Sequence, residues 1–157
     1  MTLPEQERER FCQVLHHSRT SLYRLAFSIT RNSSDAQEAV AEAVCRAYER
    51  YPQLREKEKL PRWLLKITAN EARRLCQRRG RTVSLDDLPT EPAIPGRETG
   101  DDTLWQAVQT LPRDQREAVV LFYYEDLPTE EIARIVGTSP GAVRVRLSRA
   151  REKLRSI

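Results

Sequence analysis

The segment "GTSPGAVRVRLSRARE" (residues 137–152) predicts how the C-terminal end of the chain folds. Apolar residues recur in it and just after it at steps of four, three and four, namely at Val143, Leu147, Ala150 and Leu154. This spacing predicts one face of an α-helix that packs on a core. Arginines occupy positions between them, at Arg144, Arg146, Arg149 and Arg151. These charged side chains must therefore point to the flanks of the helix or outward.

A second short helix precedes this one. The segment "EEIARIVG" (residues 130–137) carries isoleucine and valine on one face and ends at Gly137. Ser139 can cap the next helix, and Pro140 suits its first position. Two short helices joined by a tight turn that contains glycine, the second of them basic, predict a helix-turn-helix. The second helix would then contact phosphates and base edges in a DNA major groove.

Charge is unevenly distributed along the 157 residues, although the net charge is only +4. Residues 62–81 hold seven basic side chains against one acid, and residues 141–157 hold six against one. Residues 84–102 reverse the sign, with six acids against one arginine. Two basic segments around an acidic one predict a polyanion bound at two places. The alternative is a pair of solvated helix faces, with arginines pairing with acids such as Glu130 and Glu131.

Glycine and proline divide the chain into two units. The segment "LPTEPAIPG" (residues 88–96) cannot propagate a helix, which predicts a linker over residues 81–100. Apolar residues at three- and four-residue steps predict helices on both sides. We therefore expect an all-α fold of two small helical domains, residues 1–80 and 101–157, joined by a flexible acidic linker. The C-terminal domain contains the helix-turn-helix.

Individual helices follow from their capping residues. Ser34 is a suitable N-cap for a helix that Pro52 ends. Another helix is expected over residues 60–79, with Gly80 at its C-terminal end. The segment "AVVLFYY" (residues 118–124) could form a strand, but its flanks favour a helix. A short apolar stripe is expected at Leu104, Val108 and Leu111.

Composition argues against several classes of protein. The three cysteines lie far apart without a CxxC pair, which predicts buried thiols in a reducing compartment. The chain shows no secretion signal and no segment apolar enough to cross a bilayer, so we expect a cytoplasmic protein without membrane insertion. His16 and His17 have no metal-ligand partner at helical spacing, and no phosphate-binding glycine loop is present. Neither enzymatic activity nor a metal or other cofactor is expected.

Two long segments resemble a known family. The segment "LPRDQREAVVLFYYEDLPTEEIARIVGTSPGAVRVRLSRAREKLR" (residues 111–155) resembles the fourth conserved region of extracytoplasmic-function (ECF) sigma factors of bacterial RNA polymerase. The segments "LYRLAFSITRNSSDAQEAVAEAVCRAYERY" (residues 22–51) and "LPRWLLKITAN" (residues 60–70) resemble the second region. The resemblance implies a factor that binds core RNA polymerase and directs promoter recognition, DNA melting and transcription initiation.

The resemblance also implies roles for single residues. Matches to the helix that recognises the −35 promoter element are Ser139, Gly141, Ala142, Arg144, Arg146 and Arg149. Matches to the helix that recognises the −10 element and the melted non-template strand are Trp63, Asn70, Arg73 and Arg74. Matches to the surface that binds the polymerase clamp are Glu38, Glu42 and Arg46. The alternatives are a core position for Trp63 and an ordinary exposed position for Asn70.

Some residues depart from the family pattern, namely Ala41, Val44, Arg74, Gln77 and Val145. A stand-alone helix-turn-helix regulator that does not bind core polymerase explains the C-terminal unit equally well. It does not explain the basic helix that carries Trp63 and Asn70. An anti-sigma factor is a further partner to consider, and the acidic linker is hypothesised to lie in the RNA channel of the polymerase.

Overall fold

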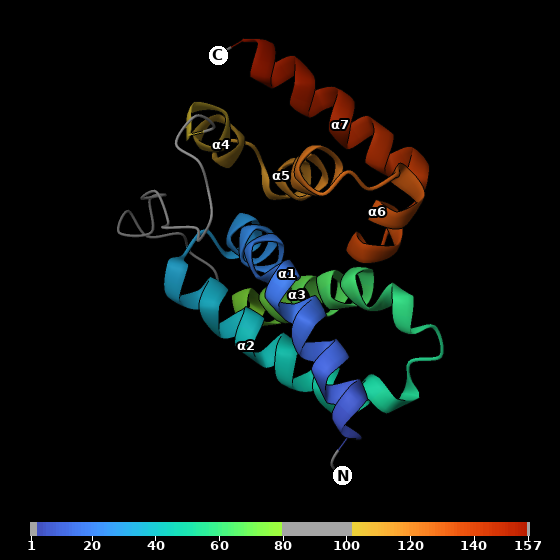
Figure 1. Cartoon of the computed structure of the whole chain (residues 1–157). Helices are drawn as coiled ribbons and strands as arrows, with labels where there is room; N and C mark the ends of the chain where they lie inside the picture. The colour runs from blue at the N-terminus through green and yellow to red at the C-terminus, as the bar shows by residue number, and fades with distance from the viewer. Residues whose placement is uncertain (1–2, 80–101, 157) are drawn as a thin grey trace.

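The computed structural model describes residues 3–79 and 102–156, and all regular elements in these ranges are helical (Figure 1). The N-terminal elements are α1 (Glu5–Thr30), α2 (Ser33–Arg50), the short 3-10 turns η1 (Tyr51–Gln53) and η2 (Lys57–Lys59), and α3 (Leu60–Arg78). The C-terminal elements are α4 (Asp102–Gln109), α5 (Arg113–Val119), the π-helical turn η5 (Val120–Tyr124), α6 (Thr129–Val136) and α7 (Pro140–Arg155). The predicted all-α class is confirmed. The predicted acidic linker, residues 81–100, lies outside the described residues.

The start of α2 differs by two residues from the sequence prediction. Asn32, not Ser34, is the N-cap, because its Oδ1 accepts a hydrogen bond from the Asp35 backbone N–H at 2.9 Å. Both residue types are good caps. Arg31 decides between them: its left-handed backbone, with φ of 53°, ends α1 and leaves Asn32 extended.

The C-terminal helices also differ in detail from the expected stripe. Val108 and Leu111 are buried as predicted, but Leu104 is 49% exposed, and Trp105 occupies the core with 1% exposure. The segment at residues 118–124 is helical and not a strand, as predicted. Its last turn, however, widens into the π-helix η5, which the sequence did not predict.

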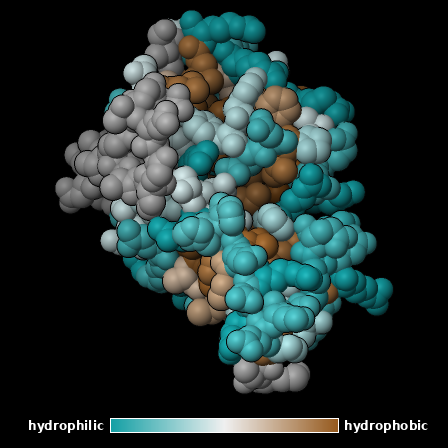
Figure 2. Space-filling view, in the orientation of Figure 1, coloured by the Kyte–Doolittle hydropathy of each residue, from teal (hydrophilic) through white to brown (hydrophobic). Residues whose placement is uncertain are grey.

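The two groups of helices pack against each other (Figure 1). Helix α1 contacts α5 and η5, and α3 contacts α6. Phe27 of α1 and Trp105 of α4 lie with ring centroids 6.3 Å apart, and the buried apolar residues of both groups form one cluster. Figure 2 shows apolar side chains near the middle of a face that is otherwise mostly hydrophilic. Independent folding of residues 1–80 and 101–157 stays a prediction.

A buried arginine joins the two groups. Arg116 of α5 is 5% exposed; its Nε donates a hydrogen bond to the Ser28 carbonyl oxygen of α1 at 2.7 Å. One terminal nitrogen donates to the Leu111 carbonyl oxygen, also at 2.7 Å. Burial lowers the pKa of the Arg116 guanidinium to about 10, so the group remains charged at neutral pH. A charged hydrogen-bond donor therefore holds α5 against the end of α1.

Among the described residues, three ion pairs connect the same two groups. They are Arg24 with Glu125 at 3.6 Å, Arg62 with Glu131 at 3.2 Å and Arg73 with Glu117 at 3.1 Å. In each pair the cation comes from α1 or α3 and the carboxylate from the C-terminal group, where Glu125 directly follows η5. Glu117 is 3% exposed, so its carboxylate is the most buried of the three acids in these pairs.

The cysteine prediction is partly wrong. Cys12 and Cys45 are exposed, Cys76 is half-buried, and none of the three forms a disulfide. Within the described ranges, none of the helices has the length and apolar character needed to cross a membrane.

Candidate nucleic-acid interface

The turn between α6 and α7 has the predicted geometry. Gly137 ends α6 in a left-handed conformation, with φ of 77°, and its N–H donates to the Ala133 carbonyl oxygen at 2.8 Å. A glycine adopts this conformation without strain. Ser139 then caps α7, because its Oγ accepts a hydrogen bond from the Ala142 N–H at 3.1 Å. Pro140 is the first residue of α7, so the sequence fixes both ends of this turn locally.

Helix α7 is docked by its apolar side and exposes the opposite side. Val143, Leu147 and Ala150 are each at most 2% exposed, and α7 packs against α5 and α6. The exposed residues in the first three turns include Arg144, Val145, Ser148 and Arg149. Among the predicted −35 residues, Ser139, Arg144 and Arg149 are exposed, and Gly141 and Ala142 are half-buried beside them.

Two other arginines of α7 are turned toward the protein. The Nε of Arg146 lies 3.8 Å from Asp114 Oδ2 of α5, and the Arg146 side chain is 26% exposed. The Nε of Arg151 donates to the Tyr123 hydroxyl at 2.6 Å. Arg144 and Arg149 are thus the better placed of these cations for DNA, and the predicted role of Arg146 has weaker geometric support.

The predicted −10 residues of α3 divide in a similar way. Asn70 and Arg74 are exposed. Trp63 is half-buried and packs against the core, which supports the structural alternative for this residue. Arg73 is 25% exposed and lies 3.1 Å from Glu117. In this arrangement the charge of Arg73 is paired with a carboxylate of α5, which the spacing of residues along the sequence did not predict.

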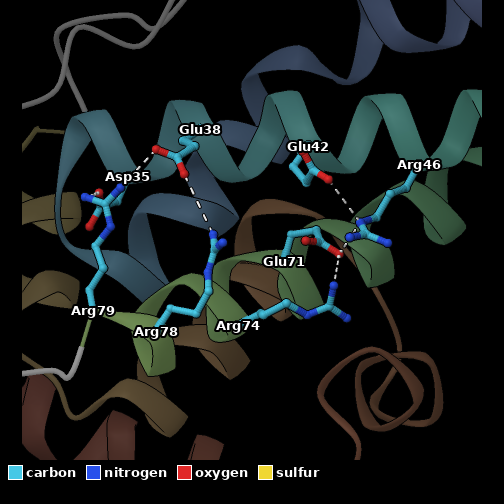
Figure 3. A network of polar contacts seen from close by, with 8 residues as sticks. All are labelled: Asp35, Glu38, Glu42, Arg46, Glu71, Arg74, Arg78 and Arg79. Carbon is cyan, nitrogen blue, oxygen red and sulfur yellow. Dashed lines mark hydrogen bonds and ion pairs between the residues drawn. The ribbon is translucent and has the colours of Figure 1, made fainter.

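The predicted polymerase-binding residues line a charged cleft between α2 and α3. Glu38, Glu42 and Arg46 project from α2 toward α3, where acidic and basic side chains meet them (Figure 3). The cleft has a volume of about 190 Å³. Helix α3 contributes Glu71, Arg74, Leu75 and Arg78 to its lining. The prediction from sequence found the α2 side of this cleft and missed the acid on α3.

Glu71 is the central carboxylate of this cleft (Figure 3). It is only 7% exposed, and its Oε2 lies 3.0 Å from Arg46 Nε and 3.3 Å from a terminal nitrogen of Arg74. Arg46 also lies 3.3 Å from Glu42, whose side chain is 54% exposed. Glu71 therefore links a predicted polymerase-binding residue to a predicted promoter-binding residue.

We expect Glu71→Gln to lower the free energy of unfolding by about 2 kcal/mol, because the amide keeps the shape of the side chain but loses charge-assisted contacts to two arginines. Glu42→Gln is the matched control, since it removes an exposed carboxylate that contacts the same Arg46. Its effect should stay within about 0.5 kcal/mol. Urea denaturation measures both values. Equal losses in the two variants would contradict the central position of Glu71.

Comparison with known proteins assigns both ends of the chain to one family. Residues 14–82 match the family model for sigma-70 region 2, and residues 101–154 match the model for sigma-70, region 4. The chain is 33% identical over 135 residues to the RNA polymerase sigma factor SigV of Bacillus subtilis, covering 85% of this chain and 81% of that protein. The chain belongs to the sigma-70 family.

Other relatives narrow this sigma factor to the ECF group. It is 31% identical over 142 residues to the ECF RNA polymerase sigma factor EcfG of Rhodopseudomonas palustris, covering 87% of this chain and 78% of that protein. The crystallised sigma factor RpoE of Bartonella quintana, in complex with the anti-sigma factor NepR, matches with a TM-score of 0.75 and 28% identity. That match covers 93% of this chain and 94% of RpoE. Some relatives are longer, and the chain spans 36% of one and 56% of another.

Family membership decides between the two functions that the sequence left open. A sigma factor of RNA polymerase directs transcription initiation at promoters, and region 2 is present here together with region 4. The stand-alone helix-turn-helix regulator is therefore not favoured. Sigma factors are in general regulators of transcription and not enzymes.

Proposed function

We propose that this ECF sigma factor recognises the −35 promoter element through the exposed face of α7. The observation that carries the proposal is the division of α7 into a buried apolar stripe and an outward face with Arg144 and Arg149. Cations at this position can contact phosphates or guanine edges in the major groove. The cap at Ser139 fixes the start of this helix and so supports its orientation.

The same proposal assigns α3 to the −10 element and α2 to the polymerase. Asn70 and Arg74 are exposed on α3, and Glu38 and Glu42 are each more than half exposed on α2. Exposure on adjacent helices lets one domain contact the polymerase and the promoter together. The chain acts by binding alone: capture of unstacked non-template bases supplies free energy for strand opening, without a metal, another cofactor or a catalytic residue.

Three regulatory and cellular assignments belong to the same proposal. An anti-sigma factor is a further partner, and the fold match to a sigma factor crystallised with one supports this. The location is cytoplasmic, where RNA polymerase acts. The acidic linker, which lies outside the described residues, would occupy the RNA channel of the polymerase.

The direct test is run-off transcription on a library of genomic fragments, with purified core polymerase and the purified chain. We expect transcripts from a defined set of start sites only when both are present. Co-elution of the chain with core polymerase at low salt is the accompanying binding assay. Failure to bind core polymerase would overturn the proposed function.

We expect Arg144→Ala to weaken binding of the holoenzyme to a duplex carrying the −35 element by about 1–3 kcal/mol if the guanidinium contacts a base. If it contacts a phosphate, the loss of affinity should be the same for all DNA sequences. The slope of log affinity against log salt concentration should then decrease in magnitude by about one. Fluorescence anisotropy at several salt concentrations measures both. Arg19→Ala removes the same charge from an exposed position on α1. A loss as large in Arg19→Ala as in Arg144→Ala would count against a local contact.

A further inference from the structure

The outward face of α7 carries an apolar side chain among its charged ones. Val145 is 47% exposed and is one of three large hydrophobic residues that are exposed in the described part of the chain, with Leu104 and Tyr123. The hydroxyl of Tyr123 accepts a hydrogen bond from Arg151. Val145 stands two residues after Val143 and two before Leu147, which are buried on the other side of the helix. It therefore points away from the core.

The fold gives no reason for valine at this position. The stripe that docks α7 is complete without it, since Val143, Leu147 and Ala150 fill the contact with the core. A β-branched side chain is also slightly unfavourable in a helix, because its rotamers are restricted. An exposed valine in a helix that carries several arginines is thus available for a contact outside the folded chain.

The residues one turn before Val145 are small. Gly141 lies within the helix, and its φ is not in the left-handed region. A Cβ added there would meet Arg144 at 3.8 Å and Ser139 at 4.0 Å, which are ordinary contact distances. The fold therefore does not require glycine, whereas the close approach of another backbone or of base edges does. The surface beside Arg144 and Arg149 therefore protrudes little, because it is formed by Gly141, Ala142 and Val145.

We propose that Val145 contacts the 5-methyl group of a thymine in the −35 element and makes this sigma factor prefer thymine at one position. This inference rests on the proposed function of α7. In the major groove the thymine methyl is the apolar group that distinguishes one base pair from the others, and small apolar side chains recognise it by direct contact. The flanking arginines can contact phosphates or guanine edges, and Val145 adds recognition of thymine, which a cation does not supply.

Uracil provides the sharpest test, because it differs from thymine only in the methyl group. Two libraries of duplexes with a random −35 region are prepared, one copied with dTTP and the other with dUTP. Holoenzyme made with core polymerase then selects promoters from each library. We expect one thymine to be enriched in the first library and this preference to disappear in the second. On single duplexes, replacing that thymine with uracil should weaken binding about fourfold, the value expected for one buried methyl-sized group.

Variants of Val145 link the methyl effect to this side chain. Val145→Ala should bind the thymine duplex about fourfold more weakly than wild type does. The variant should bind the uracil duplex as well as it binds the thymine duplex. Val145→Thr, which keeps one methyl group, should retain part of the preference. Leu104→Ala truncates an equally exposed apolar side chain on α4 and should change nothing. Because Val145 is exposed, circular dichroism should show native helix content and stability in its variants.

Two outcomes separate this inference from the proposed function. If the holoenzyme selects a −35 sequence but binds thymine and uracil duplexes equally, or if Val145→Ala keeps the full methyl preference, the role of Val145 is wrong and α7 still recognises the promoter. If no −35 preference emerges from either library, the proposed function of α7 fails, and the inference fails with it.

Discussion

Replacing Arg116 with alanine is expected to lower the free energy of unfolding by about 3 kcal/mol, because two charge-assisted hydrogen bonds disappear together. The guanidinium donates to carbonyl oxygens of Ser28 and Leu111, and the side chain is 5% exposed. Its removal leaves a cavity and takes the donors from two carbonyl groups. The Ser28 contact also holds α5 against α1. Urea denaturation followed by circular dichroism measures the change.

Two further variants serve as controls for the Arg116→Ala prediction. Arg113→Ala removes an exposed arginine from the first turn of the same helix and should change the stability by no more than about 0.5 kcal/mol. Arg116→Lys keeps the charge but loses the planar group that reaches both oxygens, so it should fall between wild type and Arg116→Ala. If Arg116→Ala were as stable as Arg113→Ala, the buried bridge between the two groups of helices would not contribute to folding.

Replacing Asn70 with alanine is expected to reduce promoter opening about tenfold, which corresponds to the loss of one hydrogen bond to an unpaired base. Asn70 is exposed on α3, so the substitution removes hydrogen-bonding groups without disturbing the core. The affinity of the closed complex should remain nearly unchanged, because the duplex is held elsewhere. Permanganate footprinting of unpaired thymines measures opening, and electrophoretic mobility at low temperature measures closed-complex binding.

Gln13→Ala is a suitable control for this experiment. It removes an exposed amide side chain from α1, outside the proposed promoter surface, and should leave opening unchanged. Normal permanganate reactivity in Asn70→Ala would remove Asn70 from the melting surface. If Asn70→Ala reduced closed-complex affinity as much as opening, Asn70 would instead contact the duplex before melting.

Local interactions explain which parts of the fold could be predicted from sequence. The α6–α7 turn depends on Gly137, Ser139 and Pro140, which act within a few residues of one another, so the pattern predicted it correctly. The predicted cap of α2 was wrong because three adequate capping residues, Asn32, Ser33 and Ser34, follow one another. The π-helical turn of η5 was not predicted because a wide turn arises from packing, for which helical periodicity contains no information.

Long-range polar contacts explain why part of the candidate site could not be predicted. Arg116 and Glu117 resemble ordinary charged residues of a helix surface, yet they are 5% and 3% exposed because α1 and α3 cover them. Arg73 was predicted to bind DNA from the resemblance, and its partner Glu117 lies 44 residues away. Exposure of Asn70, Arg144 and Arg149 agrees with the sequence prediction. Their contacts with DNA and the polymerase remain predictions.

If promoter DNA contacts Arg73, as the resemblance implies, the pairing of Arg73 with Glu117 requires an exchange of counterions at α3. A DNA phosphate that takes the position of this carboxylate leaves Glu117 without its cation in a place that water hardly reaches, which is costly. Movement of α5 away from α3 would let water reach Glu117. Under the proposed DNA contact, occupation of Arg73 by the nucleic acid and separation of the two helical groups would therefore favour each other.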